Sequence, residues 1–314
     1  MCSPSESRSP EDAPRRPGAP PGRRLRHALL GASAAILSGC DVAVLHPAGP
    51  IGESERTILL DALLIMLVIV VPTILATLFI AWRFRASNTR APYWPNWSHS
   101  GRIEIITWSI PLLTIMFLGG IAWIGSHLLD PAAPIESRAK PLEVDVVSLD
   151  WNWLFIYPQE NLASVNALVV PTGVPLDLHI TSATVWNTFF VPRLGTMIYA
   201  MYGMQSRLYL QADAPGTYHG LSTMVDGDGF PDMHFDCRAL TGTQFASWVS
   251  STRAATGATL DAAAYRQLLR PTKHAQPYTY RAVEPGLFQQ ILLQALPPGG
   301  GPRNGRGGLD VHPE

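Results

Sequence analysis

Two long apolar stretches constrain the fold of this chain more than any other feature. Residues 58–82 and 103–128 are almost free of charge, and each exceeds the ~20 residues that an α-helix needs to cross a hydrocarbon core of ~30 Å. Charged residues make up only 15% of the chain, against roughly 25% in an average soluble domain. We therefore predict two transmembrane helices, at residues 57–82 and 103–129.

The loop between the two stretches predicts their orientation. Residues 83–102 carry four arginines and no acidic residue, whereas residues 41–57 hold three acidic residues and one arginine. Basic loops stay on the cytoplasmic side of a membrane, so we predict a cytoplasmic loop at 83–102. Residues 40–56 then form an exported tether, and the chain beyond residue 129 lies on the same outer side.

The first 39 residues predict a lipoprotein signal peptide. Clustered arginines precede a short apolar core and then small residues, which is the order of regions in a secretory signal. The ending Leu37-Ser38-Gly39-Cys40 resembles the bacterial lipobox, whose cysteine is acylated and becomes the new N-terminus. Cys40 is therefore the predicted lipidation site. Cys237 is expected to be a small buried strand residue.

Beyond the second span, residues 140–241 predict an exported β domain. Short runs of alternating apolar and polar residues are separated by turns rich in proline and glycine, which predicts an antiparallel sandwich or barrel. Apolar residues then recur at helical spacing, so 242–296 is predicted as an extension with short helices. The Pro/Gly-rich residues 297–314 lack apolar anchors and predict a disordered tail.

The stretch STMVDGDGFPDM, residues 222–233, is an acidic and glycine-rich loop. Asp226, Asp228 and Asp232 offer carboxylate oxygens of the kind that Ca²⁺ prefers, and the glycines permit a tight turn. The same residues suit an ordinary turn between two strands, and Phe230-Pro231 departs from the EF-hand pattern. On the residues alone, the calcium loop and the plain turn both stay open.

Several strings in this order resemble subunit II of the haem-copper terminal oxidases. The resemblance runs from about residue 37 to 296 and is closest to the cytochrome bo-type ubiquinol oxidases, which carry an aromatic-rich C-terminal extension. It implies a two-helix transmembrane hairpin followed by an exported all-β cupredoxin-like sandwich of Greek-key type. The strings are AWRFRASN (81–88), EIITWSIP (104–111), SLDWNWLFIYP (148–158), NTFFVPRLGTMIYAMYGM (187–204) and VEPGLFQQIL (283–292).

The loop at 222–233 corresponds to a segment that differs between the branches of this superfamily. Cytochrome c oxidases hold a dinuclear copper centre there, with an upstream His and a loop C-x-E-x-C-G-x-x-H-x-x-M, because copper prefers thiolate, imidazole and thioether ligands. This chain keeps Met233 but lacks both thiolates and both imidazoles, and His219 and His234 stand at no ligand position. The resemblance implies no bound metal, and a turn whose aspartates are solvated at the outer tip of the sandwich. The replaced positions are Asn187 for the upstream His, Ser222 and Asp226 for the cysteines, Met224 for the Glu and Phe230 for the His.

The resemblance further implies a subunit of a proton-pumping ubiquinol oxidase of the aerobic respiratory chain. Quinol is oxidised and O₂ is reduced to water by the haems and copper of partner subunit I, beside subunits III and IV, with no catalytic residue in this chain. The expected location is a bacterial inner membrane, as a multi-pass lipoprotein whose processed N-terminus and β domain are periplasmic. Lipid and ubiquinol are expected contacts, whereas the net charge of −1 gives no reason to expect nucleic acid and the lost copper ligands argue against cytochrome c.

Two acidic residues in the spans have a functional and a plain interpretation. Glu104, at the cytoplasmic start of the second span, matches a family position at the mouth of a proton-uptake pathway into subunit I. A carboxylate there also complements the helix dipole, a stabilisation of about 0.3–1 kcal/mol. Asp61 lies near the outer interface, where snorkelling to water accounts for it.

Two tryptophans lie at the start of the predicted β domain. Trp151 matches the aromatic residue through which electrons reach the copper centre in relatives that use cytochrome c. Without that centre, we expect Trp151 and Trp153 to be packing anchors where the sandwich meets the membrane interface.

The alternative to an oxidase subunit is an exported, membrane-anchored lipoprotein scaffold or metal-binding module that is not part of an oxidase.

Overall fold

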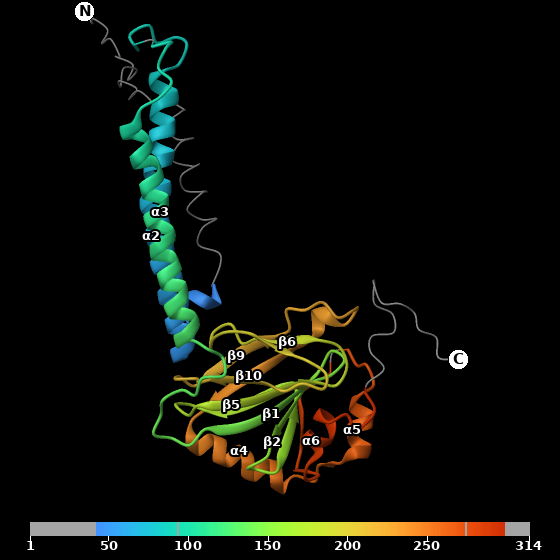
Figure 1. Ribbon diagram of the computed structural model, residues 1–314. Coiled ribbons are helices and arrows are strands. Elements are labelled where there is room, and N and C mark those ends of the chain that lie inside the picture. The colour runs from blue at the N-terminus through green and yellow to red at the C-terminus, as the bar shows by residue number, and fades with distance from the viewer. Residues whose placement is uncertain (1–41, 93, 274, 299–314) are drawn as a thin grey trace, which may run out of the picture. The chain divides into compact units, whose positions relative to one another are not determined.

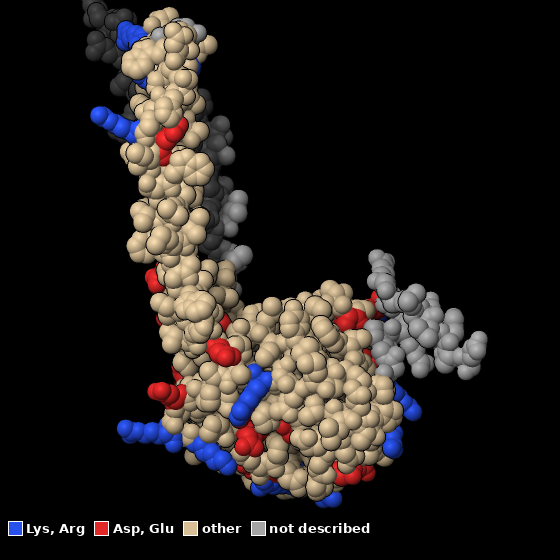
Figure 2. Space-filling model, in the orientation of Figure 1, with Lys and Arg blue, Asp and Glu red and all other residues tan. Residues whose placement is uncertain are grey.

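The computed structural model describes residues 42–92, 94–273 and 275–298, and its first feature is a pair of long helices (Figure 1). After a short turn of 3-10 helix, η1 (Ala43–Leu45), α2 runs over Pro50–Arg83 and α3 over Gly101–Leu128. Both are long and apolar enough to cross a membrane. Figure 2 shows that the charges on the visible face of this hairpin lie toward its two ends. The signal peptide and Cys40 lie outside the described residues.

The first helix begins earlier than the apolar pattern indicates. Pro50 occupies its first turn, where a missing N–H costs nothing, so the helix starts inside the stretch 40–56 that was expected to be a tether. Glu53 lies in this first turn and Glu55 in the next, which is why hydropathy alone does not reveal the start of the helix.

The segment before the first helix is hydrogen-bonded to the β domain. The N–H of Ala48 donates to the carbonyl of Arg193 (2.7 Å), and the N–H of Gly52 donates to that of Leu194 (3.1 Å). A Cβ on Gly49 would overlap the carbonyl oxygen of Gln211, so this close approach requires glycine. Residues 48–52 and the β domain therefore meet at the same end of the hairpin.

The β domain is a sandwich of a six-stranded and a three-stranded sheet. The large sheet has the order β12-β3-β2-β1-β5-β8 and the small one β4-β10-β9, with β6 and β7 forming a separate hairpin. The strands of the sandwich are β1 (Leu142–Ser148), β2 (Trp153–Tyr157), β3 (Leu162–Val165), β4 (Ala167–Pro171), β5 (Leu176–Ser182), β6 (Asn187–Phe189), β7 (Ile198–Ala200), β8 (Ser206–Leu210), β9 (Gly216–Leu221) and β10 (His234–Leu240).

The expectation of a purely antiparallel domain is wrong at two pairs of strands. β1 pairs with β5 in parallel over seven residues, and β10 pairs in parallel with β4. Each pair joins strands that are separated by other strands in the sequence, and parallel neighbours need such crossovers. Alternation of apolar and polar residues marks a strand but carries no information about the direction of its neighbour.

Two apolar layers cover the six-stranded sheet, one on each face. Between the sheets, Trp153, Phe155, Phe189 and Phe235 pack as aromatic pairs with ring centroids 5.1–6.5 Å apart. Trp153 is therefore a fully buried core residue of the sandwich, so the expectation that it lies at the membrane interface is wrong. On the other face, a second cluster around Leu154 packs against the C-terminal extension.

The C-terminal extension is less helical than predicted. Its helices are α4 (Gly242–Ala254), α5 (Ala262–Leu268) and α6 (Leu287–Leu292), and its strands are β11 (Thr259–Leu260), β12 (Tyr278–Tyr280) and β13 (Ala282–Val283). Strand β12 pairs antiparallel with β3 and so becomes the edge of the large sheet. Strands of two or three residues are too short to leave a periodic pattern, which is why the sequence predicts only helices here.

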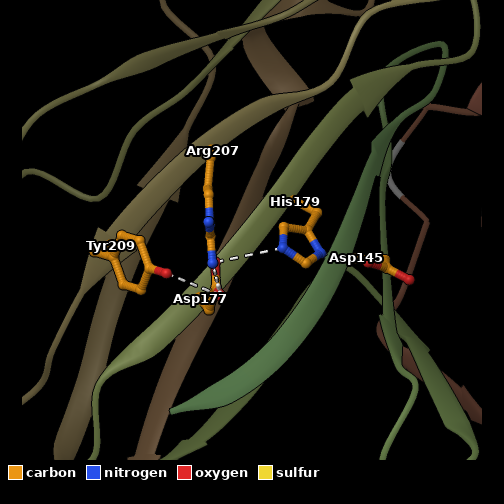
Figure 3. Close-up of polar contacts among 5 residues, drawn as sticks. All are labelled: Asp145, Asp177, His179, Arg207 and Tyr209. Carbon is orange, nitrogen blue, oxygen red and sulfur yellow. Dashed lines mark hydrogen bonds and ion pairs between the residues drawn. The ribbon is translucent and has the colours of Figure 1, made fainter. Parts of the chain in front are cut away.

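A polar cluster on the large sheet carries two carboxylates, an arginine and a histidine (Figure 3). Asp177 accepts two hydrogen bonds from the guanidinium of Arg207, at 2.8 and 2.6 Å, and one from the hydroxyl of Tyr209 at 3.0 Å. The imidazole of His179 lies between Asp145 (3.1 Å) and Asp177 (3.4 Å). The hydrogen bond to Asp145 raises the pKa of His179, so folding favours the imidazolium.

This raised pKa predicts that alkaline pH weakens the domain. The stabilisation is present below the unfolded pKa of about 6.5 and is lost as pH rises through the higher folded pKa. As pH rises from below about 6.5 to above the folded pKa of the imidazole, the free energy of unfolding of the full chain in detergent should fall more in wild type than in His179→Gln. His219→Gln, on an exposed histidine, is the matched control. Parallel pH profiles for wild type and His179→Gln would contradict this role.

Candidate functional site

The loop at 222–233 connects β9 to β10 and lies against the start of β6. Asn187 is the first residue of β6, and Ser222 follows directly after β9. The loop ends in a short turn of 3-10 helix, η2 (Phe230–Asp232), and Met233 is buried just before β10. The fold thus brings together Asn187, Ser222 and Asp226, three of the positions that the resemblance assigns to lost copper ligands, although Asn187 lies 35 positions before Ser222 in the sequence.

Hydrogen bonds between side chains close this site. Ser222 Oγ donates to Asn187 Oδ1 at 3.0 Å, and Asn187 Nδ2 donates to Asp226 Oδ2 at 3.1 Å. The N–H of Met224 donates to Ser222 Oγ at 3.3 Å and fixes the turn of the loop. Asn187, Ser222 and Asp226 are all buried, so these bonds satisfy polar groups that water does not reach.

Trp151 packs over the same loop. Its indole Nε1 donates to the carbonyl of Asp226 at 3.3 Å, and a Cβ on Gly229 would overlap its ring. The ammonium of Lys273 lies 5.4 Å from the ring centroid, within range of a cation–π interaction. Trp151 has a φ of 67°, a left-handed conformation that a bulky residue rarely adopts, so tertiary contacts hold it in place. Trp151 is thus a packing anchor, as expected, but the element that it anchors is the loop at 222–233.

The buried carboxylate of Asp226 corrects one expectation about the loop. Its side chain is not solvated at the tip of the sandwich: the residue is 8% exposed, and Oδ1 has no hydrogen-bond partner among the described residues. Burial raises the pKa of Asp226, because the charged form loses hydration. Asp228 is exposed, as predicted, and Asp232 is half-buried.

The residues of this site do not fit a dinuclear copper centre. Bridging coppers need two thiolates, and the two positions hold a hydroxyl and a carboxylate that already bond to Asn187. Within the described part of the chain, no three His, Cys, Asp or Glu side chains are grouped so that they could hold a metal ion. His219 and His234 lie with ring centroids 5.2 Å apart, and both are exposed on the small sheet.

The two acidic residues of the spans occupy different surroundings. Glu104 lies in the first turn of α3, and its Oε1 is 2.8 Å from His99 Nδ1. Asp61 is exposed on α2, three turns from Pro50, and makes no hydrogen bond or ion pair with another described residue. The partner His99 was not anticipated, although its position five residues before Glu104, ahead of the helix start, could have indicated it.

Comparison with known proteins identifies the chain's relatives. The family model described as COX Aromatic Rich Motif matches residues 254–299. The chain is 46% identical over 273 residues to ubiquinol oxidase subunit 2 of Acetobacter aceti, covering 86% of this chain and 88% of the relative. It is 43% identical over 263 residues to cytochrome bo(3) ubiquinol oxidase subunit 2 of Pseudomonas aeruginosa, covering 84% and 79%.

Among solved structures, the periplasmic domain of subunit II of cytochrome oxidase from Bradyrhizobium japonicum matches 37% of this chain and 96% of its own, with a TM-score of 0.35 and 24% identity. The two sequence relatives match a larger share of this chain, 86% and 84%, so their alignments include both helices, the sandwich and part of the extension. At these identities and coverages, the chain belongs to the ubiquinol oxidase subunit 2 family.

Proposed function

We propose that this chain is the non-redox subunit II of a proton-pumping ubiquinol oxidase of the aerobic respiratory chain. One observation carries the proposal: Asn187, Ser222 and Asp226, at three of the copper-ligand positions, hydrogen-bond to one another, and these positions offer neither a thiolate nor an imidazole. Without that centre the chain has no route by which to accept electrons from cytochrome c. Its relatives in Acetobacter aceti and Pseudomonas aeruginosa are subunits of ubiquinol oxidases, which favours ubiquinol as the donor.

The chemistry is then divided between subunits. Oxidation of quinol and reduction of O₂ to water belong to the haems and copper of partner subunit I, with subunits III and IV completing the complex. This chain binds none of these groups. Its own residues supply two membrane helices, a rigid exported domain and the closed loop at 222–233. Its contribution is to assemble and support the complex.

The proposed location is the inner membrane of a bacterium, with the β domain in the periplasm. The arginine-rich loop argues for a cytoplasmic hairpin tip. The hydrogen bond from Ala48 to Arg193 supports a common side for the two outer segments. We further propose that Cys40 is acylated after removal of residues 1–39, which gives the chain a lipid anchor beside its two spans.

Purification through a tag on this chain tests the assignment. Solubilised membranes should yield a complex that contains haem, consumes O₂ with ubiquinol, and does not oxidise cytochrome c. Mass spectrometry of the same sample should find a chain that begins at an acylated Cys40. A pure chain without haem or partner subunits would favour the rival scaffold or metal-binding module.

The hydrogen-bonded loop predicts that this chain needs no metal for stability. Asp226→Ala leaves the amide of Asn187 without its acceptor, so we expect a loss of about 1–3 kcal/mol in the free energy of unfolding. Asp228→Ala, on an exposed neighbour in the same loop, should change it by less than about 0.5 kcal/mol. Added copper should leave the melting temperature of the wild type unchanged, because a ligand of the native state would raise it. A copper-dependent rise would refute the metal-free loop.

We also propose that Glu104 assists proton uptake from the cytoplasm. Its carboxylate is exposed at the loop end of α3, and the imidazole of His99 lies 2.8 Å away, so two groups that can exchange protons adjoin at this end. A carboxylate that only complements the helix dipole has no bearing on turnover.

Kinetics in reconstituted vesicles separate these two roles. Glu104→Gln should slow quinol oxidation by roughly tenfold, equivalent to about 1.4 kcal/mol in the barrier, with the largest loss at alkaline pH, where protons are scarce. Glu104→Asp should retain most of the rate, and Glu136→Ala, an exposed acid beyond the other end of α3, should have no effect. Unchanged turnover and pumping in Glu104→Gln would leave only the dipole role.

A further inference from the structure

The tip of the hairpin concentrates positive charge that the chain itself does not neutralise. Residues 83–103 contain four arginines and no Asp or Glu. In the described residues none of these arginines forms an ion pair, and Glu104, the first acid after them, lies against His99. We call residues 83–102 the hairpin tip; its arginines are Arg83, Arg85, Arg90 and Arg102.

Two of these arginines keep donors available. Arg85 uses Nε for Ser87 Oγ (3.0 Å) and Nη1 for the carbonyl of Trp82, so Nη2 has no hydrogen bond among the described residues. Arg90 makes no side-chain hydrogen bond with any described residue, while its backbone N–H donates to Asn88 Oδ1 (3.2 Å). Guanidinium groups bind phosphate oxygens well, because their planar donors match the spacing of two oxygens.

An apolar hollow adjoins these arginines along the chain. Phe84, Pro92, Trp94 and Trp97 line a cavity of about 490 Å³ that is open to the surroundings. Trp94 is 71% exposed and Trp97 58% exposed, and so much bare aromatic surface is costly in water. Tryptophan is enriched at the boundary between hydrocarbon and headgroups, where its ring meets both.

The hairpin tip lies where two apolar helices end. α2 ends at Arg83 and α3 begins at Gly101, so the segment between them sits at the depth of the headgroups once the helices span a bilayer. We propose that the hairpin tip binds an anionic phospholipid of the adjacent leaflet, with the phosphate at Arg85 and Arg90 and the upper acyl chain in the hollow. A free phosphate ion would use the arginines but not the hollow. This proposal does not depend on the oxidase assignment.

Native mass spectrometry of the full chain in detergent, titrated with defined lipids, tests the proposal. Wild type should bind phosphatidylglycerol in preference to phosphatidylcholine. Arg85→Gln/Arg90→Gln should reduce that preference by roughly 25-fold, since each arginine near an anionic lipid contributes roughly fivefold in affinity. Trp94→Ala/Trp97→Ala should weaken the binding of both lipids, because the hollow is lost.

Two further variants keep the test decisive. Arg85→Lys/Arg90→Lys retains the charge and should keep much of the preference. Arg238→Gln/Arg281→Gln removes one exposed arginine of the β domain and one of the C-terminal extension, and should keep all of it. Equal affinity of wild type for the two lipids would overturn the proposal. A preference for phosphatidylglycerol that is unchanged in Arg85→Gln/Arg90→Gln would also overturn it. If that variant keeps its lipid preference but no longer co-purifies with a partner protein, the arginines bind the protein and the proposal is wrong.

Discussion

The exported domain depends on a sheet that is buried on both faces. Along β2, Trp153 and Phe155 face the three-stranded sheet, while Leu154 and Ile156 face the extension. Each such side chain stabilises the fold by about 1.5–3 kcal/mol when it is fully buried. The extension is therefore an integral layer of the domain: without it, the outer face of the sheet would be a large apolar patch open to water.

The same two-sided burial explains which elements could be predicted from the sequence. The spans show long apolar runs, and both predicted spans are helices in the structure, although α2 starts earlier than predicted. Strand β5 shows the alternation of apolar and polar residues that marks a strand. WLFIY of β2 is buried at every position and so shows no alternation. The three residues of β12 pair with a strand more than a hundred residues earlier, and only the folded chain reveals such a partner.

The candidate site also has features that the sequence can predict and features that only the folded chain shows. Alignment with a known loop pattern reveals which ligand positions of the chain have changed, because that depends on residue identity alone. It does not reveal that Asn187, Ser222 and Asp226 bond to one another, or that Trp151 adopts a left-handed backbone to reach the carbonyl of Asp226. Those facts depend on strands far apart in the sequence. In this chain, ordinary polar contacts hold the loop at 222–233 in shape.

The contact between residues 46–52 and the β domain orders the events of biogenesis. The segment before α2 crosses the membrane first, yet its hydrogen-bond partners at Arg193, Leu194 and Asp213 are synthesised some 140 residues later. Until the sandwich has been translocated and folded, Ala48 and Gly52 have no native partner, and α2 lacks its anchor at the outer surface. Docking of the segment at 46–52 is thereby coupled to folding of the β domain, and a chain truncated before Arg193 would lack every one of these hydrogen-bond partners.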